Sequence, residues 1–195
     1  MEDGLGGGKK NFTRMGAHLI FVDESGFMLI PSVRKTWAPK GKTPVIHHRY
    51  RNDRLSVISG ISVSPRCFRL GLYGMFFRDN IGQEEVCLFL HEVLRHLPGT
   101  VIALLDNSNI HRGDPLQQLC QRVPRLHLRY FPPYAPELNP EEGVWGFLKG
   151  KLANGRPDDI DELQRLLGKE FRALDLSQQK LRGCIQQSEL PLFLP

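Results

Sequence analysis

The sequence has few cysteines and no long apolar run, and these absences exclude several classes of protein. Its four cysteines lie far apart without a C-x-x-C pair, which argues against a zinc site and, in the absence of a secretory segment, against a disulfide framework. No apolar run approaches the ~20 residues that a membrane helix needs. Internal repeats and low-complexity tracts are also absent. We therefore expect a protein of a reduced, cytoplasmic setting.

What is present is the composition of an ordinary globular domain. The chain has 195 residues, of which 41% are hydrophobic and 24% are charged, which suits one domain with a full core. Residues 1–16 are Gly-rich and polar, so we expect a flexible tail there and a single domain over residues 17–195. The net charge of +5 and the pI near 9.2 favour polyanionic partners without establishing that they are nucleic acids.

Three acidic residues lie at positions in the predicted elements where ligand-binding carboxylates are often found. Two apolar runs that read as strands end in Asp23 and Asp106, and Glu142 falls in the expected first turn of a helix. Open α/β sheets place ligand chemistry at the carboxyl ends of their strands. One such acid reads equally well as a surface carboxylate, but three of them favour a metal site.

The periodicity and the turn residues predict a mixed sheet with an antiparallel first half and helices that cross over later. Gly26 is expected to turn the first strand back into a second one that starts at Phe27. Asp114 is expected to cap one helix, and Asn139, followed by Pro140, is expected to cap another. The predicted strands cover residues 18–24, 27–30, 55–64, 68–77, 101–105 and 126–131, and the predicted helices cover 83–97, 115–122, 140–152, 158–174 and 178–187.

The segment from residue 31 to residue 54 is strongly basic and contains aromatic residues, Trp37 and Tyr50 among them. It could contact a phosphate backbone, or it could be a solvated loop with incidental charge, and both interpretations stay open. The residues we name as candidate nucleic-acid contacts in this segment are Arg34, Lys35, Lys40, Lys42, Arg49 and Arg51.

Three carboxylates can hold two divalent cations ~3.5–4 Å apart, one at the attacking oxygen and one at the leaving oxygen. Oxygen ligands favour Mg²⁺, with Mn²⁺ as a substitute, over zinc. Such a site suits phosphoryl transfer, in which positioning and charge neutralisation carry most of the catalysis.

Residues 21–25, 105–112 and 134–145 resemble the three catalytic blocks of the DDE transposases of the mariner-type insertion-sequence superfamily, above all its bacterial members. The third block, Pro-Glu-Leu-Asn-Pro-x-Glu-x-x-Trp, is the most specific. The resemblance implies a ribonuclease H-like fold and an endonuclease that cleaves DNA and transfers strands in transposition, with Asp23, Asp106 and Glu142 as the catalytic metal ligands. It selects Glu142 over Glu141, because the preceding position is usually apolar or variable in the family.

Neighbouring residues need separate interpretations. Glu141 lies about 100° round the helix from Glu142, so only one of the two should face the metals. Glu24 should point to the other side of the strand from Asp23. Two further readings keep alternatives open. His111 could contact a phosphate, orient Asp106 or be satisfied in the core. Trp145 could stack on a base, but core packing that fixes the helix is the favoured interpretation. Arg112 and Lys149 are further candidate nucleic-acid contacts, and for Lys149 plain exposure to solvent is the alternative.

The chain departs from the resemblance at its start, where family transposases carry a helix-turn-helix region that recognises the transposon ends. A separate reading frame could supply that part, or the chain could be a catalytic fragment. We expect DNA as the partner, a homodimer on that DNA, and a bacterial, nucleoid-associated location. Two other functions stay open: a different ribonuclease H-like nuclease, and a non-catalytic DNA-binding remnant of a mobile element.

Overall fold

The computed structural model describes residues 16–29, 37–42, 53–65, 69–153 and 157–190. Within these residues the chain forms a five-stranded sheet in the order β3-β2-β1-β4-β5. The strands are β1 (His18–Met28), β2 (Arg54–Val63), β3 (Leu70–Phe77), β4 (Val101–Leu105) and β5 (Leu126–Tyr130). The first three pair antiparallel, and β4 and β5 run parallel to β1. This arrangement confirms the predicted mixed α/β sheet.

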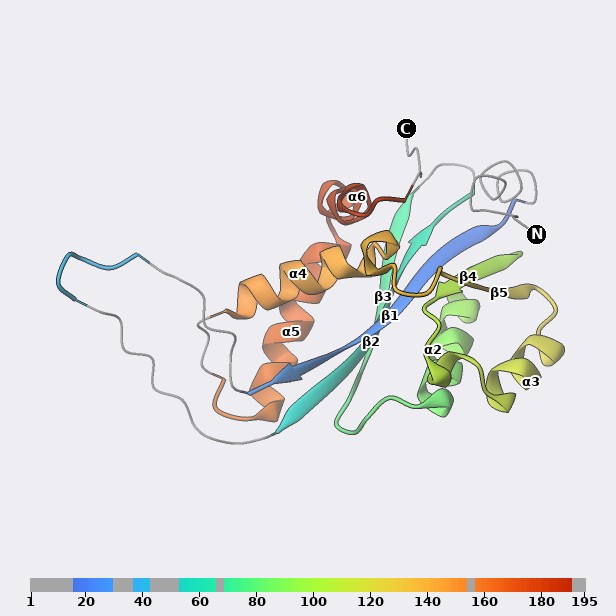
Figure 1. The fold of residues 1–195 in the computed structure, drawn as a ribbon, viewed down its shortest axis with the longest axis horizontal. Coiled ribbons are helices and arrows are strands. Elements are labelled where there is room, and N and C mark those ends of the chain that lie inside the picture. Colours follow the sequence, from blue (N-terminus) through green and yellow to red (C-terminus); the bar gives the residue numbers. More distant parts are fainter. Residues whose placement is uncertain (1–15, 30–36, 43–52, 66–68, 154–156, 191–195) are drawn as a thin grey trace.

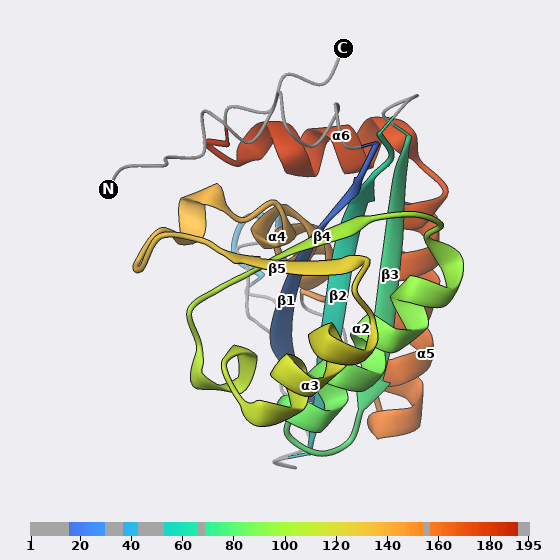
Figure 2. The same ribbon diagram turned by 90° about the vertical axis from the view of Figure 1, so that its right-hand side faces the viewer.

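Helices cover both faces of the sheet. Figure 1 shows α4 (Glu141–Leu152), α5 (Ile160–Asp175) and α6 (Gln178–Gln187) on one side and α2 (Gln83–His96) and α3 (Asp114–Arg122) on the other. Figure 2 shows α2 and α3 in front of the strands from the perpendicular direction. Among the described residues, no helix is long and apolar enough to cross a membrane.

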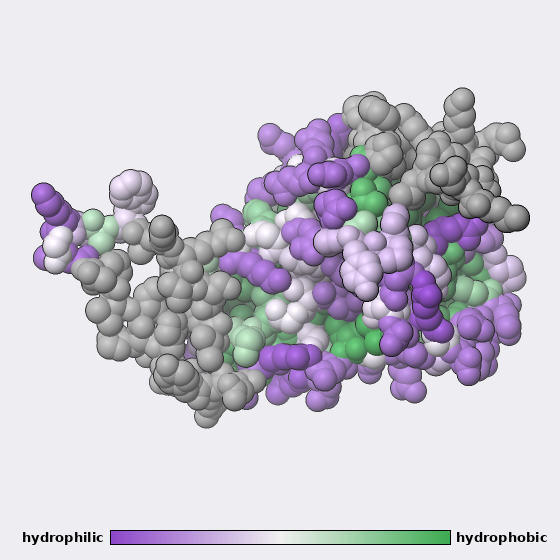
Figure 3. All heavy atoms as spheres, viewed as in Figure 1, coloured by the Kyte–Doolittle hydropathy of each residue, from purple (hydrophilic) through white to green (hydrophobic). Residues whose placement is uncertain are grey.

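The alternation of apolar side chains along the strands builds one hydrophobic core on each face. Leu19 and Phe21 of β1 pack toward α4, α5 and α6, whereas Ile20 and Val22 pack toward α2. Because both faces of β1 are covered, its apolar run is continuous, as in strands buried on both sides. On the face shown in Figure 3, hydrophilic residues cover most of the described surface.

The predicted turn at Gly26 is wrong. The first strand continues through Gly26 to Met28, where Gly26 pairs with Ser56 and Met28 pairs with Arg54 of β2. The long partner strand supplies hydrogen bonds along this whole stretch, so the glycine stays extended. The predicted strand from Phe27 is therefore the end of the first one, and the second strand begins at Arg54.

Two predicted helix caps shift by one residue. The cap of α3 is Gly113. Asp114 is instead the first residue of the helix, where its negative charge interacts favourably with the positive end of the helix dipole. The cap of α4 is Pro140. The Asn139 side chain still satisfies a free donor of that helix, because its Oδ1 accepts the Glu141 N–H at 3.2 Å.

Parts of the predicted organisation stay predictions. The Gly-rich tail lies outside the described residues up to residue 15, as does most of the basic segment. The limits of the predicted single domain, residues 17–195, are therefore an expectation. At the described end of the chain, Leu190 packs against the core on the α4 side and the Glu189 N–H donates to the Glu137 carbonyl.

Candidate active site

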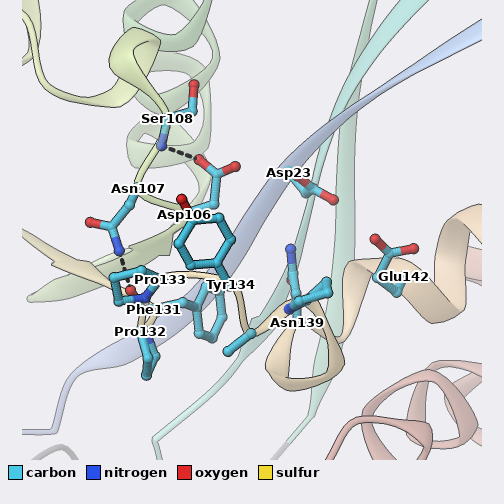
Figure 4. Close-up of a pocket in the computed structure, with 12 residues that line it drawn as sticks. Asp23, Asp106, Asn107, Ser108, Phe131, Pro132, Pro133, Tyr134, Asn139 and Glu142 are labelled. Carbon is cyan, nitrogen blue, oxygen red and sulfur yellow. Dashed lines mark hydrogen bonds between the residues drawn. The ribbon is translucent and has the colours of Figure 1, made fainter.

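Two of the predicted acids lie at the same level on neighbouring parallel strands. Phe21 of β1 is in register with Leu104 of β4, and Asp23 and Asp106 each follow two residues later. Glu142 comes from the first turn of α4. These three carboxylates line one cavity of about 410 Å³. In Figure 4 Asp23 lies between Asp106 and Glu142.

The rest of the cavity wall comes from the two segments that follow β4 and β5. Asn107 and Ser108 border Asp106, and a stretch from Phe131 to Pro136, next to Asn107, forms the rest of the wall together with Asn139 (Figure 4). Within that stretch, Tyr134 is fully exposed and has a φ of 58°, a left-handed conformation that is unfavourable for a tyrosine. Among the residues that the structure describes, no lysine or arginine lines this cavity.

Asp23 is a partly buried carboxylate with one described side-chain donor. The Trp145 Nε1–H donates to its Oδ2 at 2.8 Å. Burial raises the pKa of Asp23 to about 7, and the neighbouring charges of Glu24 and Glu142 act in the same direction, while the bond from Trp145 opposes them. The metal-free site therefore disfavours the charged form of Asp23.

Asp106 is held in place by a buried histidine. Its Oδ1 accepts from His111 Nδ1 at 2.6 Å and from the Ser108 N–H at 2.9 Å. The bond from His111 is the main reason why the pKa of Asp106 lies below its ordinary value. Asp106 is consequently ionised and oriented at neutral pH, with about half of its side chain exposed toward the cavity.

His111 bridges two acids. Its side chain is fully buried, and its Nε2 lies 3.1 Å from the Glu24 Oε1 while its Nδ1 contacts Asp106. Burial alone would lower the pKa of His111, but the hydrogen bonds and charges of these two carboxylates raise it to about 10. The structure thus places His111 where it orients Asp106, and its ring is not accessible to a phosphate.

The two adjacent glutamates of α4 lie in different surroundings. Glu142 is exposed in the cavity wall, whereas Glu141 is fully buried. The Ser59 hydroxyl donates to Glu141 Oε2, and the Ile61 N–H donates to Glu141 Oε1 at 2.5 Å. Burial raises the pKa of Glu141 well above its ordinary value.

The cavity suits divalent cations by its chemistry. Asp23, Asp106 and Glu142 offer only oxygen ligands, which Mg²⁺ and Mn²⁺ prefer. Burial disfavours the charged form of Asp23, and a bound cation would offset that cost. Among the described residues, no three acidic, histidine or cysteine side chains are already gathered at ligand distance. The chemistry of the three carboxylates fits these metals.

The predicted nucleic-acid contacts are spread over the molecule. Arg112 stacks on the Tyr130 ring, with its guanidinium carbon 5.3 Å from the ring centre, and donates to Asn107 in the cavity wall. Lys149 is exposed in the last turn of α4, with its Nζ 6.0 Å from the centre of the Phe27 ring.

Lys40 and Lys42 are exposed in the segment 37–42, which stands away from the sheet in Figure 1. The other basic candidates of this part of the chain lie outside the described residues: Arg34, Lys35, Arg49 and Arg51.

Sequence reasoning missed two contacts of this site. Trp145 was expected only to pack, and it does pack against Phe27, but it also donates to Asp23. Glu24 was placed on the other side of the strand, and its contact with His111 was not foreseen. The i to i+4 spacing of Glu141 and Trp145 was the available signal that both face the sheet.

Comparison with known proteins identifies the family. Residues 18–164, well over half of the chain, match the family model described as DDE superfamily endonuclease. The chain belongs to the DDE superfamily of endonucleases. A search of curated protein sequences finds no match.

Solved structures share the fold of this endonuclease. The mariner Mos1 paired end complex with Mn matches with a TM-score of 0.65 and 15% identity, over 93% of this chain and 57% of that one. The catalytic domain of Mos1 mariner transposase matches with a TM-score of 0.54 and 12% identity, over 92% of this chain and 87% of that one. A simian T-cell lymphotropic virus intasome in complex with PP2A regulatory subunit B56 gamma matches with a TM-score of 0.56 and 14% identity, over 91% and 57%. The fold is ribonuclease H-like, as the resemblance implied, and the chain spans 57% of the length of the first structure.

Proposed function

We propose that this endonuclease is the catalytic domain of a transposase, which hydrolyses a DNA phosphodiester and then joins the freed 3′-hydroxyl to a target strand. The observation that carries the proposal is the convergence of Asp23, Asp106 and Glu142, distant in sequence, on one cavity. Two divalent cations bound by these carboxylates would activate the attacking oxygen and stabilise the leaving oxygen.

The chain's own residues prepare this site. His111 fixes the orientation of Asp106, so that one carboxylate oxygen remains directed to the cavity while the other is bonded. Trp145 fixes Asp23 in the same way from the side of α4. Holding ligands in one geometry before the substrate arrives lowers the cost of assembling the reactive complex.

DNA is the substrate that we propose, with basic side chains binding its phosphates. Arg112 donates to Asn107 in the cavity wall, Lys149 is exposed in the last turn of α4, and Lys40 and Lys42 are exposed in the segment 37–42. The net charge of +5 acts in the same direction. Arg34, Lys35, Arg49 and Arg51 belong to this proposal as residues of the same basic segment.

The structural relatives supply the rest of the proposal. One matching structure is a Mos1 transposase paired-end complex with the left transposon end, and this supports our proposal of a homodimer that holds two DNA ends. We further propose that a helix-turn-helix part recognises the ends and that the protein acts at the bacterial nucleoid.

Cleavage of DNA carrying the ends of the mobile element tests the function. The sequence flanking the gene provides the inverted repeats, and the duplex is incubated with the protein in Mg²⁺, in Mn²⁺ or in a chelator. We expect nicked and joined products that require the metal and that Asp106→Asn abolishes. Equal products from wild type and Asp106→Asn would sink the assignment. Preferential cleavage of an RNA–DNA hybrid over duplex DNA would replace the transposase by another ribonuclease H-like nuclease.

A further inference from the structure

We propose that Glu141, the buried neighbour of Glu142, is a positioning residue that fixes the rotation of helix α4 so that Glu142 faces Asp23. The inference rests on the proposed metal-dependent function. It assigns a task to the one fully buried acid of the described residues, which none of the steps above uses. Glu141 does not touch the cavity, so it acts only through the helix that carries Glu142.

The Glu141 carboxyl ties the start of α4 to strand β2. Its two oxygens accept from the Ser59 hydroxyl and from the Ile61 N–H, two residues apart on the same strand. Ser59 is the register partner of Asp23 in the ladder between β1 and β2. The tie therefore joins α4 to the sheet at the rung that carries the first catalytic aspartate.

A second tie lies one helical turn further on. The Trp145 indole donates to Asp23 Oδ2 at 2.8 Å, and Trp145 follows Glu141 by four residues, so both anchors are on the same face of α4. Glu142 lies about 100° round the helix from Glu141. A helix held at two points one turn apart can neither roll nor slide, and the direction of Glu142 is set with it.

The size of the effect follows from the helix geometry. Side-chain ends lie about 5–6 Å from a helix axis. A roll of about 10° therefore moves the Glu142 carboxylate by about 1 Å, whereas metal–ligand distances vary by only about 0.2 Å. A misplacement of about 1 Å can cost on the order of 10² in rate. A small loss of rotational control is thus enough to weaken metal binding.

Packing alone does not require a glutamate at this position. Glu141→Leu keeps apolar volume between α4 and β2, but it leaves the Ser59 hydroxyl and the Ile61 N–H without their acceptor, which is destabilising. Metal binding is therefore compared at a temperature at which every variant is folded. A loss of metal affinity in the folded protein separates the positioning role from a structural one.

The test compares Glu141→Leu with Glu141→Gln in the full chain. Glutamine can accept from the Ile61 N–H and donate to the Ser59 hydroxyl, so it keeps both ties without the charge. Mn²⁺ binding is measured by electron paramagnetic resonance, and thermal unfolding is measured without metal. We expect Glu141→Leu to raise the Mn²⁺ Kd about 10–100-fold, the range for lost outer-shell partners. Its Tm should be lower than that of the wild type, because two buried donors lose their acceptor, so the Kd is measured well below that Tm. Glu141→Gln should bind Mn²⁺ within about threefold of wild type.

Two serines of β2 give matched variants. Ser59→Ala removes one tie and should weaken Mn²⁺ binding in the same direction by a smaller factor, which keeps the test decisive if Glu141→Leu does not fold. Ser62→Ala, a buried serine on the opposite face of the strand, should leave Mn²⁺ binding unchanged.

The outcomes separate the two proposals. Wild-type Mn²⁺ affinity in Glu141→Leu and in Ser59→Ala overturns the positioning role alone. Equal weakening in Glu141→Gln and Glu141→Leu overturns it too, because the charge and not the bonds would then matter. Mn²⁺ binding by the wild type should be lost in Asp106→Asn. If the two proteins bind Mn²⁺ equally, or if neither binds it, the metal-dependent function is wrong, and the positioning role is wrong with it.

Discussion

Replacing Asp23 by asparagine should stabilise the metal-free protein at alkaline pH while abolishing DNA cleavage. Asparagine has nearly the same shape, and its carbonyl oxygen can still accept from the Trp145 indole. The substitution removes the carboxylate that burial disfavours. In the wild type, burial raises the pKa of Asp23 from 3.8 to about 7.

The magnitude follows from that difference of about 3 pH units. Each unit corresponds to ~1.36 kcal/mol, so ionised Asp23 costs the folded protein on the order of 4 kcal/mol at pH 8. Because the pKa of Asp23 is raised in the folded state, the contribution of this residue to folding stability is fully present below pH 3.8. That contribution is lost as the pH rises from there through about 7. The advantage of Asp23→Asn should therefore grow by about 1.4 kcal/mol per pH unit between pH 5 and pH 7 and level off near pH 8. For a chain of this length it amounts to a rise in Tm on the order of 10 °C.

Urea unfolding of both proteins at pH 5, 6, 7 and 8 in a chelator measures the difference. Mg²⁺ added at pH 8 should stabilise the wild type and leave the variant nearly unchanged, because a ligand stabilises only the state that binds it. A stability difference that is independent of pH, or a variant less stable than the wild type at pH 8, would refute the reasoning about burial.

Three further predictions concern single side chains. Trp145→Phe removes the indole donor and should raise the pKa of Asp23 further, so that Mn²⁺ titrations at pH 7 give a weaker Kd. Tyr134→Gly should be more stable in urea than Tyr134→Ala by about 1 kcal/mol, because glycine relieves the φ of 58° and alanine does not. Lys149→Gln should lower the slope of log K for duplex DNA against log salt by ~0.9, the value for one phosphate contact, whereas the exposed Lys169→Gln on α5 should leave the slope unchanged. Equal slopes for both lysine variants would count against a phosphate contact at position 149.

Local patterns in the sequence were enough to predict most elements of the fold. The helix from Gln178 to Gln187 and the strand from Val101 to Leu105 have the predicted bounds, because periodicity and flanking turn residues are properties of neighbouring positions. The turn predicted at Gly26 failed, because glycine is compatible with both a turn and an extended strand. The partner strand from Arg54 decided between them, and pairing between distant residues leaves no local signal.

The residues of the candidate site could be predicted from the sequence, but the contacts that hold them could not. The sequence pointed to Asp23 and Asp106 as acids that follow apolar runs, and the resemblance to the family selected Glu142 over Glu141. The expected strand end at Asp23 is wrong, because β1 continues to Met28 and Asp23 lies within the strand. How these acids are held could not be read in this way, because the contacts of Trp145 with Asp23 and of His111 with Glu24 join residues 122 and 87 positions apart.

The sequence by itself determined which side chains could do chemistry, because that depends on residue type and on the local structure that each segment prefers. Only the tertiary structure decided which of them are ionised, oriented or buried, because those properties depend on the neighbours that the fold supplies. Glu141 and Glu142 demonstrate the division most directly. They are the same residue type at adjacent positions, yet one lies in the core bonded to β2 and the other lines the cavity, since the packing of α4 on the sheet sets their directions.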